Sequence, residues 1–233
     1  MNILSFVKKI FQNLLLLKSW LIEKYLNQVI EKTKLKKFND FNFNLGKMTN
    51  TPLVNFFHLR FYEIDFYIKK YKIKKVIEIG SGRTTFLFNE VYNLNCVSYE
   101  QDEVWKSKLL KSSKWNPTVE IKEVENYKNG AKFKDLNDLS CDMLYIDGPY
   151  IPHKRNKNTL SGKPAYYDFE TILAKKLPKI ILIDIRTDTV DSMLESKLLK
   201  KYNFIGGFRF CIERRKLGFL KLKYHSVFIK KGI

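Results

Sequence analysis

Four segments of the chain end in residues that could bind a polar ligand, namely Gly80, Glu100, Asp147 and Asp184. Each follows a short run of apolar, often β-branched residues, which is the pattern of a buried parallel strand. The carboxyl ends of parallel strands meet at one edge of an open α/β sheet, and ligands bind in the crevice there. The spacing therefore predicts one ligand site bordered by all four residues.

The first of these segments carries the most specific pattern. Only Glu78 interrupts the strand-like run Val76–Ile79, and Gly80-Ser81-Gly82 follows it directly. Glycines let the backbone turn tightly and approach a ligand closely. The apolar residues after Thr84 suit a helix that faces the sheet, so this segment is typical of the first half of a nucleotide-binding α/β unit. The alternative is a tight strand-to-helix turn that binds nothing.

Acidic residues end the other three strand patterns. Glu100 lies 20 residues after Gly80, the spacing at which a carboxylate reaches the ribose hydroxyls of a nucleoside. Asp147 is followed by Gly148-Pro149, which indicates a turn, and Asp184 ends the last parallel pattern. Packing alone does not require an acidic residue at the end of each strand.

The order and spacing of three motifs resemble those of class I S-adenosylmethionine-dependent methyltransferases. The motifs are Glu78-x-Gly80-x-Gly82, then Glu100, then Ile146-Asp147-Gly148. The branch most similar is that of the small-molecule O-methyltransferases, and the similarity covers roughly residues 52–233. It implies S-adenosyl-L-methionine as cofactor. It also implies an α/β fold with a doubly wound, mostly parallel, seven-stranded sheet whose last strand is antiparallel.

The resemblance assigns a role to each matched residue. The loop that would wrap the methionine part of the cofactor comprises Glu78, Gly80, Ser81 and Gly82. Glu100 would hold the ribose, and Asp147 would line the pocket where the methyl group is transferred. The adenine contact in this family follows the third strand, predicted here at 118–124, so its candidates are Glu125 and Asn126. A nicotinamide cofactor is the competing ligand, but its fingerprint needs a third glycine where this chain has Thr85.

Methyl transfer is an in-line displacement that depends on holding donor and acceptor in place, and a base helps when the acceptor is a hydroxyl. Asp147 is the first candidate base; the alternative is a carboxylate that caps the following turn. His153, in the loop 149–163, is the second candidate, against the alternative of a solvated bystander. His58 and His225 fall inside a helix pattern and a strand pattern, so packing roles are expected for both.

The segments after Asp147 and Asp184 bear on metals and on the acceptor. Some resembling O-methyltransferases bind a divalent ion through the Asp of the fourth strand and an adjacent Asp-Asn or Asp-Asp after the fifth. This chain has Asp147 and Asp184, but Ile185 replaces the second residue of that pair and Arg186 follows it. Because a hard cation needs several oxygen ligands and an arginine would repel it, we predict no catalytic metal. The loop that follows Asp147 is basic and would attract an anionic acceptor, through Lys154, Arg155, Lys157 and Lys163. The alternative is an ordinary basic surface loop.

Composition sets the broad class of the protein. The 233 residues are 45% hydrophobic and 15% aromatic, which excludes a disordered chain and allows one domain with an appendage. Three cysteines show no metal spacing and no disulfide framework, so we expect a reducing, cytoplasmic location. The formal charge of +19 indicates either polyanionic partners or a lysine-rich solvated surface.

Residues 1–50 form a separate unit in this interpretation, and 51–233 the methyltransferase-like domain. Within 1–36, apolar residues recur at helical spacing and predict an amphipathic helix: Ile3, Val7, Ile10, Leu14, Leu17, Leu21 and Tyr25. This face would pack on the core or on a second subunit, making a homo-oligomer, or would lie on an anionic membrane. Residues 37–50, polar and rich in Asn, are predicted to be a linker.

Other elements are predicted from local signals. Thr51-Pro52 begins a helix that runs to about Tyr71, and Asp102 caps a helix that contains Trp105. A further helix is expected over 188–202. The segments 208–213 and 220–229 then suit an antiparallel pair of strands.

Three functions follow from these patterns. The first is an S-adenosylmethionine-dependent O-methyltransferase acting on a small or saccharide-type acceptor that is anionic if the basic loop binds it. The second keeps the cofactor but takes RNA as acceptor; no module that interleaves aromatic and basic residues supports it. The third is a binding or scaffold protein that retains the fold without the chemistry.

Overall fold

The structure is a computed structural model of the whole chain. It describes residues 3–29, 32–49, 57–112, 116–127, 130–136, 139–149, 176–184, 186–207 and 224–233. Among these residues, no helix is long and apolar enough to cross a membrane.

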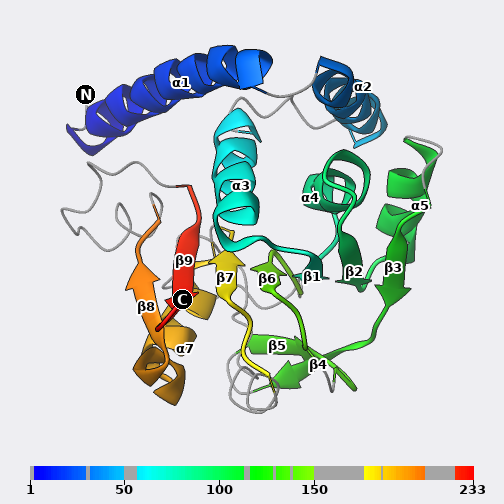
Figure 1. Ribbon diagram of the computed structural model, residues 1–233, viewed down its shortest axis with the longest axis vertical. Coiled ribbons are helices and arrows are strands. Elements are labelled where there is room, and N and C mark those ends of the chain that lie inside the picture. Colours follow the sequence, from blue (N-terminus) through cyan, green and yellow to red (C-terminus); the bar gives the residue numbers. More distant parts are fainter. Residues whose placement is uncertain are drawn as a thin grey trace.

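The centre of the molecule is a seven-stranded sheet with the order β3-β2-β1-β6-β7-β9-β8 (Figure 1). The strands are β1 (Lys75–Ile79), β2 (Asn95–Glu100), β3 (Thr118–Ile121), β6 (Met143–Ile146), β7 (Ile180–Ile183), β8 (Tyr202–Ile205) and β9 (Ser226–Lys230). Strands β3 to β7 in this order are parallel, and β9 is antiparallel to both of its neighbours. The predicted doubly wound sheet with an antiparallel last strand is confirmed.

Both faces of the sheet are buried, which explains why its strands are apolar at consecutive positions. Val76, Met143 and Ile180 lie in register on neighbouring strands and belong to one core. The next residue of each strand points to the opposite side and joins a second core. A single-residue shift in register would exchange the two sets of side chains.

Helices cover the two faces unequally (Figure 1). The first core is covered by α1 (Ile3–Val29), α2 (Lys32–Thr49), α3 (Phe57–Tyr71), α4 (Arg83–Phe86) with its π-helical continuation η1 (Leu87–Val91), and α5 (Glu103–Lys111). The second core is covered by α7 (Thr187–Glu195), the 3₁₀ turn η2 (Lys197–Lys200) and a hairpin of β4 (Val124–Tyr127) with β5 (Gly130–Phe133).

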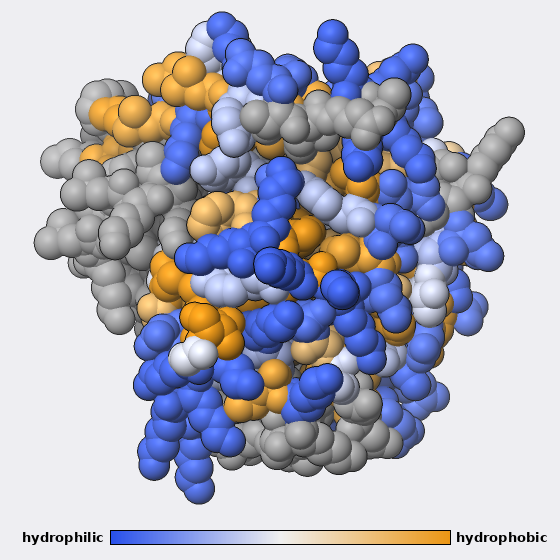
Figure 2. Space-filling model, in the orientation of Figure 1, coloured by the Kyte–Doolittle hydropathy of each residue, from blue (hydrophilic) through white to orange (hydrophobic). Residues whose placement is uncertain are grey.

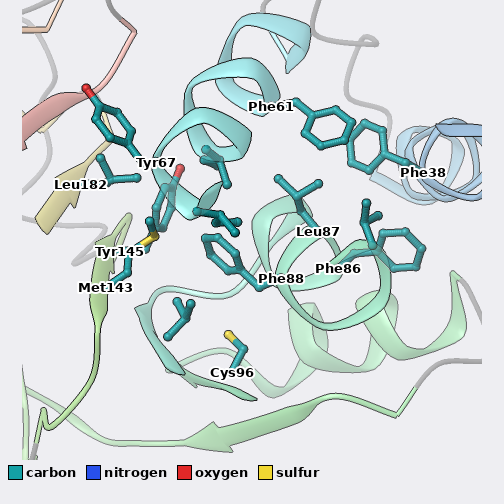
Figure 3. Packing of buried hydrophobic residues seen from close by; sticks show 14 of the residues in the cluster. Phe38, Phe61, Tyr67, Phe86, Leu87, Phe88, Cys96, Met143, Tyr145 and Leu182 are labelled. Atoms are coloured by element: carbon teal, nitrogen blue, oxygen red, sulfur yellow. The ribbon is translucent and has the colours of Figure 1, made fainter. Parts of the chain in front are cut away.

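The linker predicted for 37–50 is wrong, because the chain is helical up to Thr49. Its buried apolar residues, Phe38, Phe41 and Leu45, recur every three or four positions and so share one face of α2. Phe38 packs against Phe61 of α3 (Figure 3). The many Asn residues between these positions obscured the helical period.

The predicted N-terminal helix is present, but its predicted apolar face does not pack on the core. Ile22 and Leu26 are buried instead, and α1 contacts α3. The predicted stripe from Val7 to Tyr25 is exposed to solvent. The helix therefore carries apolar residues on two faces, and the periodicity pointed to the outer one.

Three boundaries also differ from those predicted. The third strand ends at Ile121 rather than 124, and the helix expected over 188–202 ends at Glu195. The last strand, predicted at 220–229, begins at Ser226 and ends at Lys230. It pairs with Tyr202–Ile205, where Tyr202 is buried and Phe204 packs on Phe228 at 4.7 Å between ring centroids. The predicted helix start at Thr51-Pro52 and residues 208–223 lie outside the described residues.

The packing of α2 can be tested with a matched pair of substitutions. The Phe41 ring is 2% exposed and stacks on Phe86 with centroids 4.0 Å apart, so Phe41→Ala should lower the free energy of unfolding by about 3 to 5 kcal/mol. Phe43 is 49% exposed, and Phe43→Ala should change it by less than about 0.5 kcal/mol. Urea denaturation of both variants measures the difference; equal effects would mean that α2 does not pack as described.

Candidate functional site

The site begins where the backbones of β1 and β6 touch at their carboxyl ends. A Cβ atom at Gly80 would lie 2.7 Å from the amide nitrogen of Gly148, and one at Gly148 would lie 2.7 Å from the Cα of Gly80. Gly80 also has a φ of +88°, a conformation that side chains disfavour. Both positions therefore require glycine, and the contact fixes the loop after β1 against Asp147.

Gly82 is different from Gly80. A Cβ atom there would meet nothing within 4 Å, and its φ of 178° is ordinary extended backbone. Its amide donates to Oγ1 of Thr85 at 2.8 Å. The turn itself does not need glycine at this position, contrary to the prediction.

The buried side chain of Glu78 fixes the loop from the side of the protein core. The side chain is fully buried, and its carboxylate accepts hydrogen bonds from the hydroxyls of Thr84, of Thr85 at 2.5 Å and of Ser98 at 2.5 Å. Burial raises the pKa of Glu78 to about 7, although these three hydrogen bonds act in the opposite direction. Glu78 does not line the cavity described below, so it acts on the loop rather than on a cofactor.

Glu100, at the end of β2, holds the same loop from the side. One carboxylate oxygen accepts from the Ser81 amide at 2.9 Å and from the Ser81 hydroxyl at 2.8 Å. The other accepts from the amides of Gln101 and Asp102 at 2.7 and 3.1 Å. Four donors thus orient a carboxylate that is only 7% exposed.

Helix α5 supplies the next wall of the site. As predicted, Asp102 caps this helix and accepts from the amides of Val104 and Trp105 at 2.8 and 3.0 Å. The Trp105 indole then donates to the Ser81 carbonyl at 2.9 Å. The indole ring is thereby fixed against the glycine loop.

These elements enclose an open cavity of about 280 Å³, near the lower end of the range for small-molecule sites. Its lining comprises Gly80, Ser81, Glu100, Gln101, Asp102, Trp105, Phe133, Asp147, Gly148, Pro149 and Arg186. Of the residues predicted from sequence, the structure therefore brings Gly80, Ser81, Glu100 and Asp147 together around one space. Trp105 and Phe133 were not predicted as site residues, because no local motif marks an aromatic wall.

The predicted adenine contacts do not belong to the cavity wall. Because β3 ends at Ile121, Glu125 and Asn126 fall in the separate hairpin β4–β5. Glu125 forms an ion pair there with Lys132 at 3.3 Å. The residues that border the cavity beyond β2 are instead Gln101 and Asp102.

Asp147 faces the cavity and is paired with an arginine. Its side chain is 34% exposed, and its carboxylate lies 3.5 Å from Nε of the almost fully buried Arg186. Arg186 also donates to the carbonyls of Asp147 and of Pro149, the latter at 2.9 Å. Burial lowers the pKa of Arg186, and Asp147 and Asp184 act against that shift. The guanidinium therefore places a buried positive charge beside Asp147.

Asp184, at the tip of β7, does not line the cavity, contrary to the prediction; it is buried beside Arg60 of α3. The Arg60 guanidinium lies 3.1 Å from the Asp184 carboxylate and donates to the Tyr224 hydroxyl. Burial acts to lower the pKa of Arg60, but Asp184 and Tyr224 outweigh it, and the net direction is upward. Sequence reasoning missed Arg60, since nothing in a helix pattern shows which strand end its side chain will reach.

Behind this pair lies a chain of buried polar groups. Glu63 of α3 accepts from the Tyr224 amide and from the amide and Nδ1 of His225, the latter two at 3.0 and 2.9 Å. Nε2 of His225 lies 3.3 Å from the Tyr145 hydroxyl. His225 is fully buried, as its predicted packing role requires.

Two predicted features cannot be placed. His153 and the basic loop with Lys154, Arg155, Lys157 and Lys163 lie outside the described residues. Among the residues that are described, no group of three or more His, Cys, Asp or Glu side chains is arranged to hold a metal ion.

No protein-family model matches the chain, and no curated protein does. Among solved structures, it is similar to a protein described as a caffeoyl-CoA O-methyltransferase from Staphylococcus aureus, with 16% identity over 91% of this chain and 98% of that one and a TM-score of 0.47. An O-methyltransferase from Bacillus cereus, in complex with SAH, shows 15% identity over 89% and 96% with a TM-score of 0.42. The O-methyltransferase TomG from Streptomyces achromogenes, in complex with SAM, shows 11% identity over 89% and 95% with a TM-score of 0.37. All three are described as O-methyltransferases.

The two glycines of the loop give a direct test of the backbone contact. In Gly80→Ala the new methyl group would collide with the backbone of Asp147 and Gly148, which should lower the free energy of unfolding by about 3 kcal/mol or more. Gly82→Ala meets no atom and should change it by less than about 1 kcal/mol. Urea denaturation measures both; a Gly80→Ala protein as stable as Gly82→Ala would refute the contact.

The buried Glu78 predicts a pH dependence of stability. Between pH 4.5 and 7 the folded protein keeps a proton that the unfolded chain has lost, so stability falls as pH rises through this window and levels off above it. The difference amounts to about 3 kcal/mol. Glu78→Gln removes the titration, and the gap in unfolding free energy between wild type and variant should change by that amount across the window. A gap that stays constant with pH would contradict the prediction.

Proposed function

We propose that the chain is an S-adenosylmethionine-dependent methyltransferase. The observation that carries the proposal is the cavity at the carboxyl ends of β2, β1 and β6, which are adjacent strands, bordered by Glu100, the Gly80-Ser81 loop and Asp147. Ligands of open α/β sheets bind at this edge. These are the positions at which the motif resemblance places the ribose, the methionine part and the transfer site.

The residues present suit the cofactor. Glu100 is held by four donors, so its carboxylate is already oriented where the ribose hydroxyls are expected. Gly80 and Ser81 line the cavity, and the absence of a side chain at Gly80 allows close approach of the methionine part. Trp105 and Phe133 offer aromatic surface for the adenine ring of the cofactor. When bound, the sulfonium supplies the methyl group, and the protein holds the acceptor in line with it.

The acceptor we propose is a hydroxyl of a small or saccharide-type molecule that carries negative charge. Asp147 is the candidate base because its carboxylate faces the cavity, and His153 is the second. The negative charge is proposed because the loop of 149–163 is basic and would attract an anion.

We propose further that transfer needs no metal ion. Magnesium requires several oxygen ligands, and the carboxylate of Asp147 is instead engaged by the guanidinium of Arg186 at 3.5 Å. A cation placed beside Asp147 would be repelled by this buried charge. In sequence, the place of the second ligand that metal-dependent enzymes use is taken by Ile185, and Arg186 follows it.

Calorimetry with S-adenosylmethionine and with its demethylated product tests the cofactor. Both should bind in the presence of EDTA, and Glu100→Gln should weaken binding roughly 10- to 100-fold, since a hydrogen bond to a charged group is lost. Glu125→Gln is the matched control, because Glu125 lies in the hairpin β4–β5, and it should bind like the wild type. Thermal unfolding of both variants shows whether each is folded.

Two outcomes would oppose the proposal. If the folded wild type binds neither compound, the proposed cofactor is rejected, and the proposed activity with it. Equal weakening by both substitutions would place the adenosine over the hairpin. If the cofactor binds, transfer of its labelled methyl group to anion-exchange fractions of a cell extract tests the acceptor; label found only in RNA or only in neutral products would reject an anionic small molecule.

A further inference from the structure

Helix α1 presents an apolar surface that is largely exposed to solvent; at its C-terminal end, Tyr25 contacts the Tyr62 ring of α3 with centroids 6.1 Å apart. Its inner face packs Ile22 and Leu26 into the core. Its outer face consists of Val7, Ile10, Leu14, Leu17, Leu21 and Tyr25, which are between 41 and 54% exposed. We call these six residues the outer face of α1.

The outer face is one stripe along the helix. Its members are three or four positions apart, which places them on the same side. Leu16 and Trp20, 37 and 50% exposed, widen the stripe. Figure 2 shows hydrophobic side chains gathered over α1 at the upper left of the molecule. Contiguous apolar patches of this kind mark contact surfaces in folded proteins.

The charges beside this face are positive. The exposed charged side chains among the described residues of α1 are Lys9 and Lys24, and Lys24 lies 4.0 Å from the centre of the Trp20 ring. Helix α2, which lies along the same edge of the molecule (Figure 1), exposes five lysines and one acidic residue, Asp40. The chain as a whole carries a formal charge of +19. By helical spacing Lys24 lies on the same face as Leu17 and Leu21, at the last turns of the stripe. An apolar stripe that includes lysine fits a surface that is apolar inside and anionic outside.

We propose that the outer face of α1 binds the anionic surface of a lipid bilayer, with the helix lying in the plane of the interface. An amphipathic helix with basic residues beside its apolar face binds membranes in this way. The lysine stems can extend along apolar surface while their charges reach lipid phosphates, and a tryptophan at this border suits the headgroup region. A second copy of the chain would instead bring Lys9 and Lys24 close to the like charges of its own α1. The binding is independent of the proposed methyl transfer.

Sedimentation of the full chain with vesicles tests the proposal. Vesicles of phosphatidylcholine and phosphatidylglycerol in a three-to-one ratio should bind the protein, and more weakly as salt is added; pure phosphatidylcholine should bind much less. Replacing Leu17 and Leu21 together by Glu should weaken binding ~10-fold or more, because it puts charge where apolar area is buried. Val104→Glu, on the 64% exposed Val104 of α5, replaces a single exposed apolar residue elsewhere by Glu and should have no such effect.

A second readout places the helix in the lipid. Brominated lipids should quench the fluorescence of the wild type, and Trp20→Phe, which keeps Trp105 and Trp115, should lose that quenching. Sedimentation equilibrium without lipid then tests the competing occupant of the outer face of α1, a second copy of the chain. Failure to bind anionic vesicles, equal binding by the Leu17/Leu21 variant, or a stable dimer that this variant dissociates would each overturn the proposal.

Discussion

The contact between Gly80 and Gly148 is the constraint on which the site depends. Two backbones meet without side chains between them, so the ends of β1 and β6 lie closer than any other residue type would permit. This approach places the Ser81 loop directly beside Asp147. Everything that surrounds the cavity is arranged about that point, and the parallel register of β2, β1 and β6 delivers Glu100 to it.

Around the contact, each acidic side chain at or near the end of a strand has its own polar partners. Glu78 is buried under hydroxyls, Glu100 under amides, and Asp147 and Asp184 each face an arginine. A buried charge is tolerated only with such partners. The consequence is a rigid rim of oriented acceptors, with little freedom left for the loop to collapse into an empty cavity.

Much of this could be predicted from sequence because it is local. A strand, its terminal carboxylate and a glycine turn are adjacent in the chain, so Gly80, Glu100 and Asp147 were found. Arg60 and Trp105 could not be recognised as partners of Asp184 and Ser81, since only the packing of their helices brings them there. Glu125 was misplaced by a strand three residues shorter than predicted, and the periodicity of α1 could not tell which of its two apolar faces the core would take.

The position of β9 between β7 and β8 has a consequence for how the chain is made. β8 reaches the sheet through β9, whose residues follow it by some twenty positions. Until the ribosome releases 226–230, the outer edge of β7 and the whole of β8 expose unpaired backbone donors and acceptors, which other strands can capture. Nascent chains that pause between the synthesis of β8 and that of β9 are therefore the ones that most need chaperones.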